Sequence, residues 1–251
     1  SGSETYPGLL GYHLALYAAP VSDGKMPMES KTWLLQTEPL AEWNTVKKID
    51  YQGMFPKSVL HYQAPGMPVD VTLEAWSPWI PGDIEATSHP GAYFTLRVRN
   101  KTRKTYRIGL LFIGRNLSGD WCVGRTNRIE EDPSSVHLRF LNVHCAKDDP
   151  RGGELRFSFE KKDWQVTYLE SWNAVTKNFH FNPKEVRLSA LEIFSREGRL
   201  PDSSRAYVAL GENHELCGAV AAFGLVHPGR TADWSFQAAG HYANRPLGHR
   251  Y

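Results

Sequence analysis

Apolar and polar residues alternate with a period of two along much of the chain, and the clearest example runs from Val69 to Trp76. In this segment the apolar positions are Val69, Val71, Leu73 and Ala75, and the polar positions between them are Asp70, Thr72 and Glu74. Because successive side chains of a strand point to opposite faces, the pattern predicts a strand that is buried on one face. The alternation returns at residues 92–99 and 106–112, on either side of the polar segment 100–104, and predicts an antiparallel hairpin there.

Other short apolar stretches predict further strands, at residues 33–37, 46–51, 58–62, 136–141, 155–159, 165–169, 205–210, 219–226 and 232–239. Pro, Gly and Asp residues gather between these stretches, where tight turns need a fixed or positive φ. A single helix is predicted over residues 183–197, with Asn182 as its cap and Gly198 at its end.

The number of strands requires a second layer of structure. With 251 residues, 41% of them hydrophobic, the chain can bury a core without disulfides or metal. We find no long flexible linker and no repeat of fixed period. The sequence therefore predicts one all-β domain over residues 1–251, a large two-sheet antiparallel sandwich with one or two short helices. Residues 1–10 are expected to be a tag or a flexible segment.

The charge pattern argues against a polyanionic partner. Lys and Arg number 29 and Asp and Glu number 27, which leaves a formal net charge of +2, and the two signs are interspersed. Neither nucleic-acid nor membrane-surface binding is indicated by such a pattern. No apolar run reaches the roughly 18 residues that a transmembrane helix needs, and the first residues lack the features of a signal peptide. A cytoplasmic location is the default expectation, although a removed leader would leave the same sequence.

The cysteines and the glycosylation patterns add little. Cys122, Cys145 and Cys217 are odd in number and far apart, which favours reduced thiols over a disulfide framework or a zinc knuckle. Two tripeptides, at 100–102 and 116–118, match the N-glycosylation pattern, but a pattern this short recurs by chance. They do not establish secretion.

Histidines and carboxylates do not form a recognisable reactive motif. The nearest histidine groupings, His137 with His144 and Cys145 and His241 with His249, lack metal-ligand spacing, so we predict no metal site and no cofactor. The acidic runs at 130–132 and 148–149 lie beside prolines in predicted turns. Glycosidic catalysis needs two carboxyl groups roughly 5 to 10 Å apart across a sugar, which adjacent acids in a turn rarely provide.

Aromatic residues are the more suggestive feature. The eight tryptophans include the close pair Trp76 and Trp79, and sugar rings stack on such side chains. A large sandwich also needs large side chains between its sheets, and Trp234, whose neighbours on the same face are Ala232 and Phe236, is predicted to lie in the core. For any single tryptophan, packing is the favoured role.

Several landmarks along the chain resemble the amino-terminal domain of glycoside hydrolase family 116, which includes bile-acid β-glucosidase, the non-lysosomal glucosylceramidase. The central ones are Ser-Pro-Trp-Ile-Pro-Gly-Asp at 77–83, the Ser and Pro loop with the following strand at 88–94, and Asn100 at the end of that strand. Gly-Met-Phe-Pro at 53–56 precedes them, and the segments 191–200 and 241–246 follow in the family's order. The glycine-rich element that opens the family domain is missing, and Gly82 stands where a larger apolar residue is common.

The resemblance implies a β-supersandwich that packs against a helical-barrel catalytic domain or subunit. In that family both catalytic carboxylates of retaining β-glucoside hydrolysis belong to the barrel, so no residue of this chain is expected to be catalytic. The chain would be a non-catalytic module of a β-glucosidase or glucosylceramidase, with the barrel and glucosides as its partners. Candidate carbohydrate or domain-interface residues are Trp76, Trp79, Asp83, Asn244 and Arg245.

Two other functions remain open. The chain is a stand-alone carbohydrate-binding module if Trp76 or Trp79 serves as a stacking platform. It is an independent enzyme if Asp83, Asp148 or Asp149 acts on a glycoside.

Overall fold

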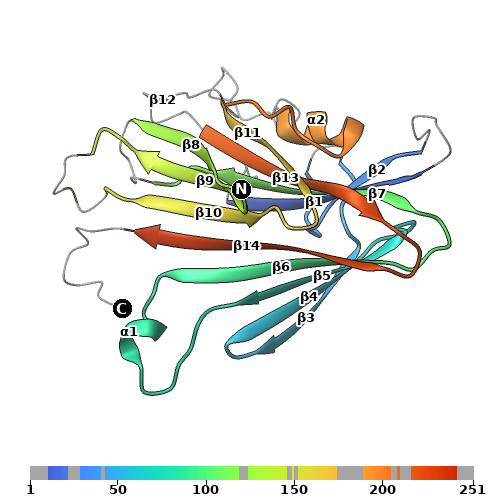
Figure 1. Ribbon diagram of the computed structural model, residues 1–251, viewed down its shortest axis with the longest axis horizontal. Coiled ribbons are helices and arrows are strands. Elements are labelled where there is room, and N and C mark those ends of the chain that lie inside the picture. Colours follow the sequence, from blue (N-terminus) through green and yellow to red (C-terminus); the bar gives the residue numbers. More distant parts are fainter. Residues whose placement is uncertain are drawn as a thin grey trace, which may run out of the picture.

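The chain forms two antiparallel sheets that face each other (Figure 1). The computed structural model describes residues 11–21, 29–40, 43–118, 124–145, 149, 152–173, 189–204, 208–209 and 216–241. The five-stranded sheet has the order β11 (Gln165–Asn173), β13 (Leu216–Val226), β7 (Tyr106–Arg115), β1 (Tyr12–Pro20), β2 (Lys31–Leu34). The nine-stranded sheet has the order β12 (Val208–Ala209), β8 (Arg125–Glu131), β9 (Ser135–Asn142), β10 (Glu154–Glu160), β14 (Thr231–His241), β6 (Gly91–Asn100), β5 (Val69–Trp76), β4 (Lys57–Gln63), β3 (Lys48–Met54).

The two helices of the described residues are short, α1 (Ile84–Thr87) and α2 (Ser189–Glu197). The predicted all-β two-sheet sandwich with one or two short helices is therefore confirmed. The strand predicted from alternation, Val69 to Trp76, coincides with β5 and buries Val69, Val71 and Leu73.

Aromatic side chains fill the space between the sheets. Phe112 of β7 meets Phe157 and Phe159 of β10 and Phe236 of β14, with ring centroids 4.6 to 5.8 Å apart. Trp234 is fully buried beside Phe159 and Phe236, which confirms its predicted place in the core. The core thus joins β7 of one sheet to β10 and β14 of the other.

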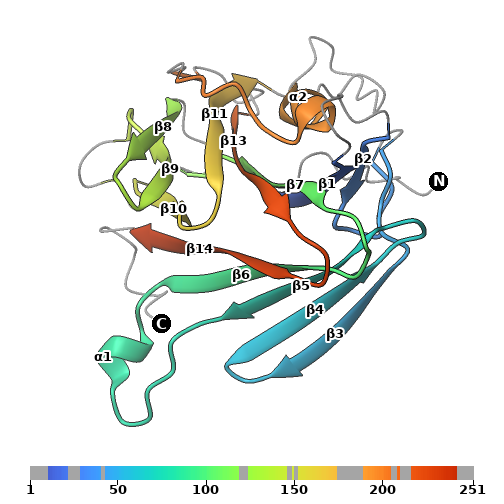
Figure 2. The same cartoon turned by 45° about the vertical axis from the view of Figure 1, so that its right-hand side comes forward.

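Helix α2 covers the outer face of the five-stranded sheet (Figure 2). Phe194 of α2 lies edge-on to Tyr17 of β1, with ring centroids 6.1 Å apart. The helix ends at Gly198, whose φ is +76°, as the sequence predicted. A Cβ added at Gly109 of β7 would lie 2.3 Å from the Gly198 carbonyl oxygen, so the end of α2 rests directly on the sheet. The predicted first turns and the cap Asn182 lie outside the described residues.

The predicted hairpin between residues 92–99 and 106–112 is wrong. Strand β6 pairs with β5 and β14, whereas β7 pairs with β1 and β13 in the other sheet. The different burial of β6 and β7 explains why they belong to different sheets. Strand β6 alternates in its second half, while residues 108–114 of β7 are all buried because one face meets the core and the other meets α2. The connection between β6 and β7 therefore crosses from one sheet to the other.

Asn100 holds that crossing in place. Its Nδ2 donates to the carbonyl oxygens of Lys104 (2.8 Å) and Val226 (2.9 Å), and its Oδ1 accepts from the N–H (2.9 Å) and hydroxyl (2.8 Å) of Thr102. Asn116 and Ser118 repeat the same turn. In both places the Asn-x-Ser/Thr pattern forms a local turn in which the asparagine is fully buried. These two tripeptides serve the fold.

Candidate functional site

The outer face of the nine-stranded sheet carries a row of outward-pointing side chains that crosses five neighbouring strands. The row is Trp76 on β5, Tyr93 on β6, Gln237 on β14, Ser158 on β10 and His137 on β9. Each residue is the register partner of the next, so the order follows directly from strand pairing. Trp76 and Tyr93 stack with ring centroids 4.5 Å apart and an angle of 16° between the planes.

A trough of about 310 Å³ lies over this row. Its lining side chains include Trp76, Tyr93, Thr95, Ser135, Ser158, Glu160, Ser235 and Gln237. Small hydroxyl residues, Thr95 on β6, Ser235 on β14 and Ser158 on β10, lie in the middle of the trough. The larger rings of Trp76 and Tyr93 lie at one side of it. This difference in side-chain size explains why an antiparallel sheet face is hollow at this point.

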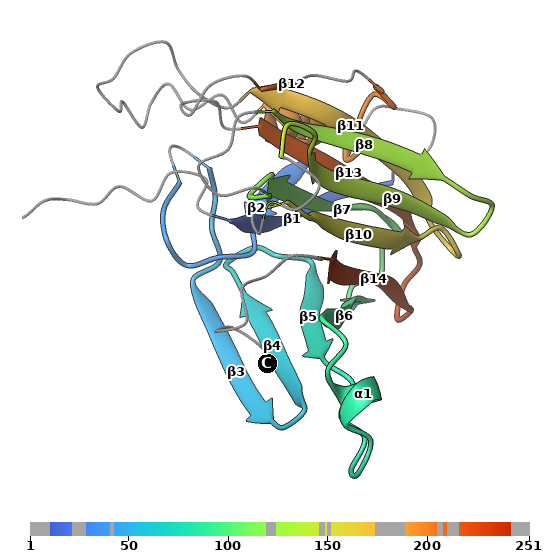
Figure 3. The same ribbon diagram turned by 90° about the vertical axis from the view of Figure 1, so that its left-hand side faces the viewer.

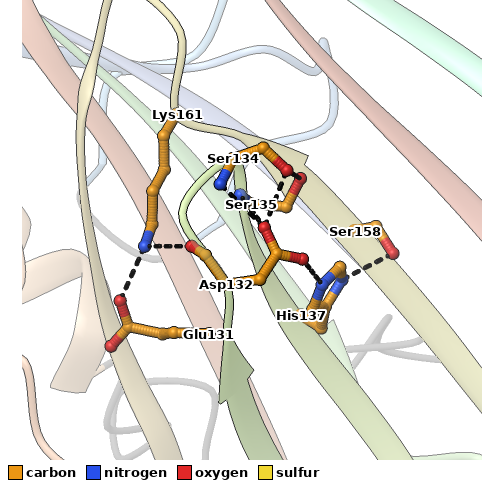
Figure 4. A network of polar contacts seen from close by, with 7 residues as sticks. All are labelled: Glu131, Asp132, Ser134, Ser135, His137, Ser158 and Lys161. Carbon is orange, nitrogen blue, oxygen red and sulfur yellow. Dashed lines mark hydrogen bonds and ion pairs between the residues drawn. The ribbon is translucent and has the colours of Figure 1, made fainter.

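A polar network borders the trough at β9 and β10 (Figure 4). His137 contacts Asp132 through Nε2 (2.8 Å to Oδ2) and Ser158 through Nδ1 (2.9 Å to Oγ). Asp132 lies in the turn between β8 and β9, where its Oδ1 accepts from the backbone N–H groups of Ser134 (2.7 Å) and Ser135 (2.8 Å). The carboxylate is thus fixed by the turn before it contacts the imidazole.

Asp132 decides which nitrogen of His137 carries the proton. A carboxylate only accepts hydrogen bonds, so when the imidazole is neutral its Nε2 donates to Asp132 and its Nδ1 is left as an acceptor. The hydroxyl of Ser158 must then donate to Nδ1, and the lone pairs of its oxygen remain for another donor. Ser158 therefore presents a hydrogen-bond acceptor to the trough.

The order Asp132, His137, Ser158 is also that of a nucleophilic triad, but the surroundings of Ser158 do not suit acyl transfer. Such catalysis needs N–H donors aimed at the developing oxyanion. Ser158 lies in the middle of β10, which pairs with β9 on one side and β14 on the other, so ladder hydrogen bonds engage the nearby main-chain N–H groups. The described surroundings of Ser158 therefore offer no oxyanion site, and the network serves to orient its hydroxyl.

Three carboxylates around this turn make stability depend on pH. Hydrogen bonds from the Ser134 hydroxyl and His137 lower the pKa of Asp132, and Arg139 and Lys161 lower the pKa values of Glu130 and Glu131. A carboxyl whose pKa is depressed on folding stabilises the protein above its unfolded value and loses that contribution as the pH falls. We expect the melting temperature to decrease as the pH drops below about 4.5, which is the ordinary pKa of a glutamate side chain.

Melting curves between neutral and acidic pH test this expectation. Asp132→Asn keeps the Oδ1 acceptor of the turn and removes the titrating group, so its melting temperature should decline less steeply with acid than that of the wild type. Equal slopes for the two proteins would contradict the assignment to Asp132.

Ion pairs occupy the sheet face beside the trough. Lys57 pairs with Glu74 (2.6 Å), and Arg97 pairs with Asp233 (2.8 Å), which raises the pKa of Arg97. Arg139 pairs with two carboxylates on the neighbouring strands. All these groups are partly exposed, so each pair contributes little to stability. Their main effect is to neutralise these cations.

The structure separates the residues that the sequence singled out. Trp76 lines the trough, whereas Trp79 lies in the connection between β5 and β6, with its ring edge-on to Phe55 at 5.5 Å. Asp83 precedes α1, is exposed, and does not line the trough. Asn244 and Arg245 lie outside the described residues. Sequence reasoning missed the contributions of Tyr93 and Ser158, because only strand register brings them beside Trp76.

The β3–β4 hairpin and α1 project from one corner of the nine-stranded sheet (Figure 3). These two segments carry exposed apolar side chains, and Phe55 of one contacts Trp79 beside the other. We call these side chains the apolar tip: Met54, Phe55, Trp79, Ile80 and Ile84, which are 49% to 82% exposed. Exposed apolar groups that lie together mark interaction sites more often than single ones do. The trough and the apolar tip are therefore the two candidate sites.

Within the described ranges, no three or more His, Cys, Asp or Glu residues come together in a group that could hold a metal ion. Nor does any helix in that part of the chain have the length and apolar character to cross a membrane.

The fold and the two candidate sites define a large β-sandwich module with one face covered by a helix and the opposite face left uncovered by the described residues. Residues 16–250 match the family model described as beta-glucosidase 2, glycosyl-hydrolase family 116 N-term. The chain belongs to this family of N-terminal domains, as the sequence landmarks indicated. None of the curated proteins matches the chain.

Proposed function

We propose that the chain is a non-catalytic module of a β-glucosidase of the family 116 type, and that it packs against and supports a helical-barrel catalytic domain or subunit. The observation that carries the proposal is the apolar tip, which the sandwich leaves exposed although its own core is well filled. Membership of a family of N-terminal domains supports the expectation of a catalytic companion. The described strands and helices, which belong to one two-sheet sandwich, support a single domain.

The apolar tip is held in shape before any partner arrives. The β5–β6 connection closes on itself, because Thr87 Oγ1 accepts from the Ile80 N–H at 3.0 Å and donates to the Ile80 carbonyl at 3.2 Å. Phe55 supports Trp79 from the neighbouring hairpin. Rigid aromatic groups lose little conformational entropy on binding, which makes them effective interface anchors.

The tip would be the anchor of a larger interface. A stable protein–protein contact buries roughly 1,200 to 2,000 Å² in total, more than five side chains provide. We infer that the surrounding polar edge of β3 and β4 forms the rim. In this arrangement the reactive carboxylates belong to the partner, and this chain contributes to their support.

Replacement of Trp79 by alanine is expected to weaken association with the co-expressed helical catalytic domain by about tenfold or more, as at an interface hot spot. The stability of the isolated chain should change little, because Trp79 is half exposed. Phe55→Ala should act in the same direction. Leu225→Ala, an exposed apolar residue on β13, is the control and should leave association unchanged.

Analytical ultracentrifugation of the mixed domains gives the dissociation constants. If Trp79→Ala and Phe55→Ala associate as tightly as the wild type does, the apolar tip is not the interface that we propose. Turnover of an aryl β-glucoside by this chain alone, abolished by Asp83→Asn or Asp149→Asn, would instead make it an independent enzyme.

A further inference from the structure

We propose that the trough on the outer face of the nine-stranded sheet is a binding site for a neutral oligosaccharide. The trough shares no lining residue with the apolar tip, and the proposal does not depend on a catalytic partner. It is carried by the size of the trough, the stacked rings at its side, the hydrogen-bonding groups of its floor and the neutralised charges beside it.

The dimensions suit a short saccharide. The volume of about 310 Å³ is at the lower end of ligand pockets, which run from about 300 to 1,000 Å³. The four residues of the row that line the trough, Trp76, Tyr93, Gln237 and Ser158, lie on four neighbouring strands, and three intervals of about 4.8 Å give a length of roughly 14 Å. Such a length holds a short oligosaccharide laid across the strands.

The stacked rings supply an aromatic wall. Tyr93 lies between Trp76 on β5 and Gln237 on β14, so Trp76 covers one face of the Tyr93 ring and the other face is turned toward the middle of the trough. The two side chains are 41% and 38% exposed. A sugar ring packs its C–H groups on such a face, while stacking against Trp76 fixes the orientation of the Tyr93 ring.

The floor offers both donors and acceptors. Ser158 presents its oxygen as an acceptor, because its hydroxyl donates a hydrogen bond to Nδ1 of the neutral His137 imidazole. Thr95 and Ser235 share one hydrogen bond of 3.3 Å, so only one of the two hydroxyl protons is used in it and the other can be donated to a ligand. Gln237 adds an amide with two donors and an acceptor. Each sugar hydroxyl both donates and accepts, so this mixture is matched to a polyol.

The charges favour a neutral ligand. Lys57, Arg97 and Arg139 are already paired with carboxylates, so these cations do not form a free cluster for a phosphate or a nucleic acid. Protein–protein interface cores are depleted in serine, and Ser135, Ser158 and Ser235 all line this trough. The trough is therefore better suited to a saccharide than to a packed helix.

Isothermal titration calorimetry with cellotetraose, maltotetraose and mannotetraose tests the proposal on the 251-residue chain. We expect at least one of the three to bind saturably with a dissociation constant of about 1 mM or below. Tyr93→Ala and Ser158→Ala should each weaken that binding, Tyr93→Ala by about tenfold or more. Tyr93→Phe keeps the ring and should retain binding, and Trp79→Ala, in the apolar tip, should bind as the wild type does.

Unchanged melting temperatures identify the variants that remain folded, and Gln237→Ala replaces Tyr93→Ala if the latter unfolds. The proposal is overturned if none of the three saccharides gives saturable heat up to about 10 mM, tenfold above the expected constant. It is equally overturned if folded Tyr93→Ala and Ser158→Ala bind as tightly as the wild type. Neither result bears on association through the apolar tip, which is measured with the helical domain and without sugar.

Discussion

Replacement of Trp234 by alanine is expected to lower the free energy of unfolding by about 3 to 5 kcal/mol. The side chain is fully buried, and its ring lies against those of Phe159 at 5.3 Å and Phe236 at 5.6 Å. The substitution removes a large apolar surface and leaves a cavity that the close-packed core cannot fill. Urea denaturation followed by tyrosine and tryptophan fluorescence measures the loss.

Two variants separate burial from residue type. The indole N–H of Trp234 has no hydrogen-bond partner within the described part of the chain, so Trp234→Phe loses no bond and should cost clearly less than the alanine variant. Trp76→Ala removes the same residue type from the outer face and should cost roughly 1 kcal/mol or less. A loss below about 1 kcal/mol for Trp234→Ala would contradict the described core.

The contrast between these two tryptophans shows how far the alternation of residues can be trusted. Along β5 and β14 one face is buried and the other is not, so a period of two identifies the inward residues without knowledge of the partner strands. Trp234 was correctly placed in the core for this reason. Strand β1, Tyr12–Pro20, was not predicted, because residues 15–19 are buried on both faces and show no period.

Pairing between strands was not available from local pattern. The segments 92–99 and 106–112 are close in sequence, yet they do not pair with each other: β6 lies between β5 and β14, and β7 lies between β1 and β13. A short polar connection allows either a hairpin or a crossing between sheets. The choice depends on tertiary packing, here on the second apolar layer beneath α2 that requires β7 in the middle of the five-stranded sheet.

The trough shows the same limit at the level of the site. The sequence singles out Trp76 as a stacking residue, and His137 lies on β9 between the buried Val136 and Leu138. No spacing along the sequence relates them to Tyr93, Ser158 or Gln237. They become neighbours only through four successive registers, and a one-residue slip in any of these would turn the side chains to the other face.

A different set of buried contacts, around Asn116, is expected to be nearly as important for stability as the aromatic core. Asn116→Ala should lower the free energy of unfolding by roughly 3 kcal/mol. Its Nδ2 donates to the carbonyl of Thr126 and to Oδ1 of Asn127, both at 3.0 Å, and its Oδ1 accepts from the Ser118 N–H at 2.9 Å. Asn127 in turn donates to the Cys217 carbonyl at 2.9 Å, which connects β8 of one sheet to β13 of the other. Without Asn116 these buried groups lose partners that water cannot replace.

The variant Asn116→Asp tests whether the hydrogen bonds or the volume matter. Its shape is the same, but a carboxylate oxygen would stand where the amide nitrogen donates, facing oxygen acceptors in a buried site. We therefore expect Asn116→Asp to be at least as destabilising as Asn116→Ala in urea denaturation. Asn44→Ala, which removes one partly buried bond of 3.3 Å, is the matched control and should cost about 1 kcal/mol or less. Wild-type stability of Asn116→Asp would show that the network does not hold the two sheets together.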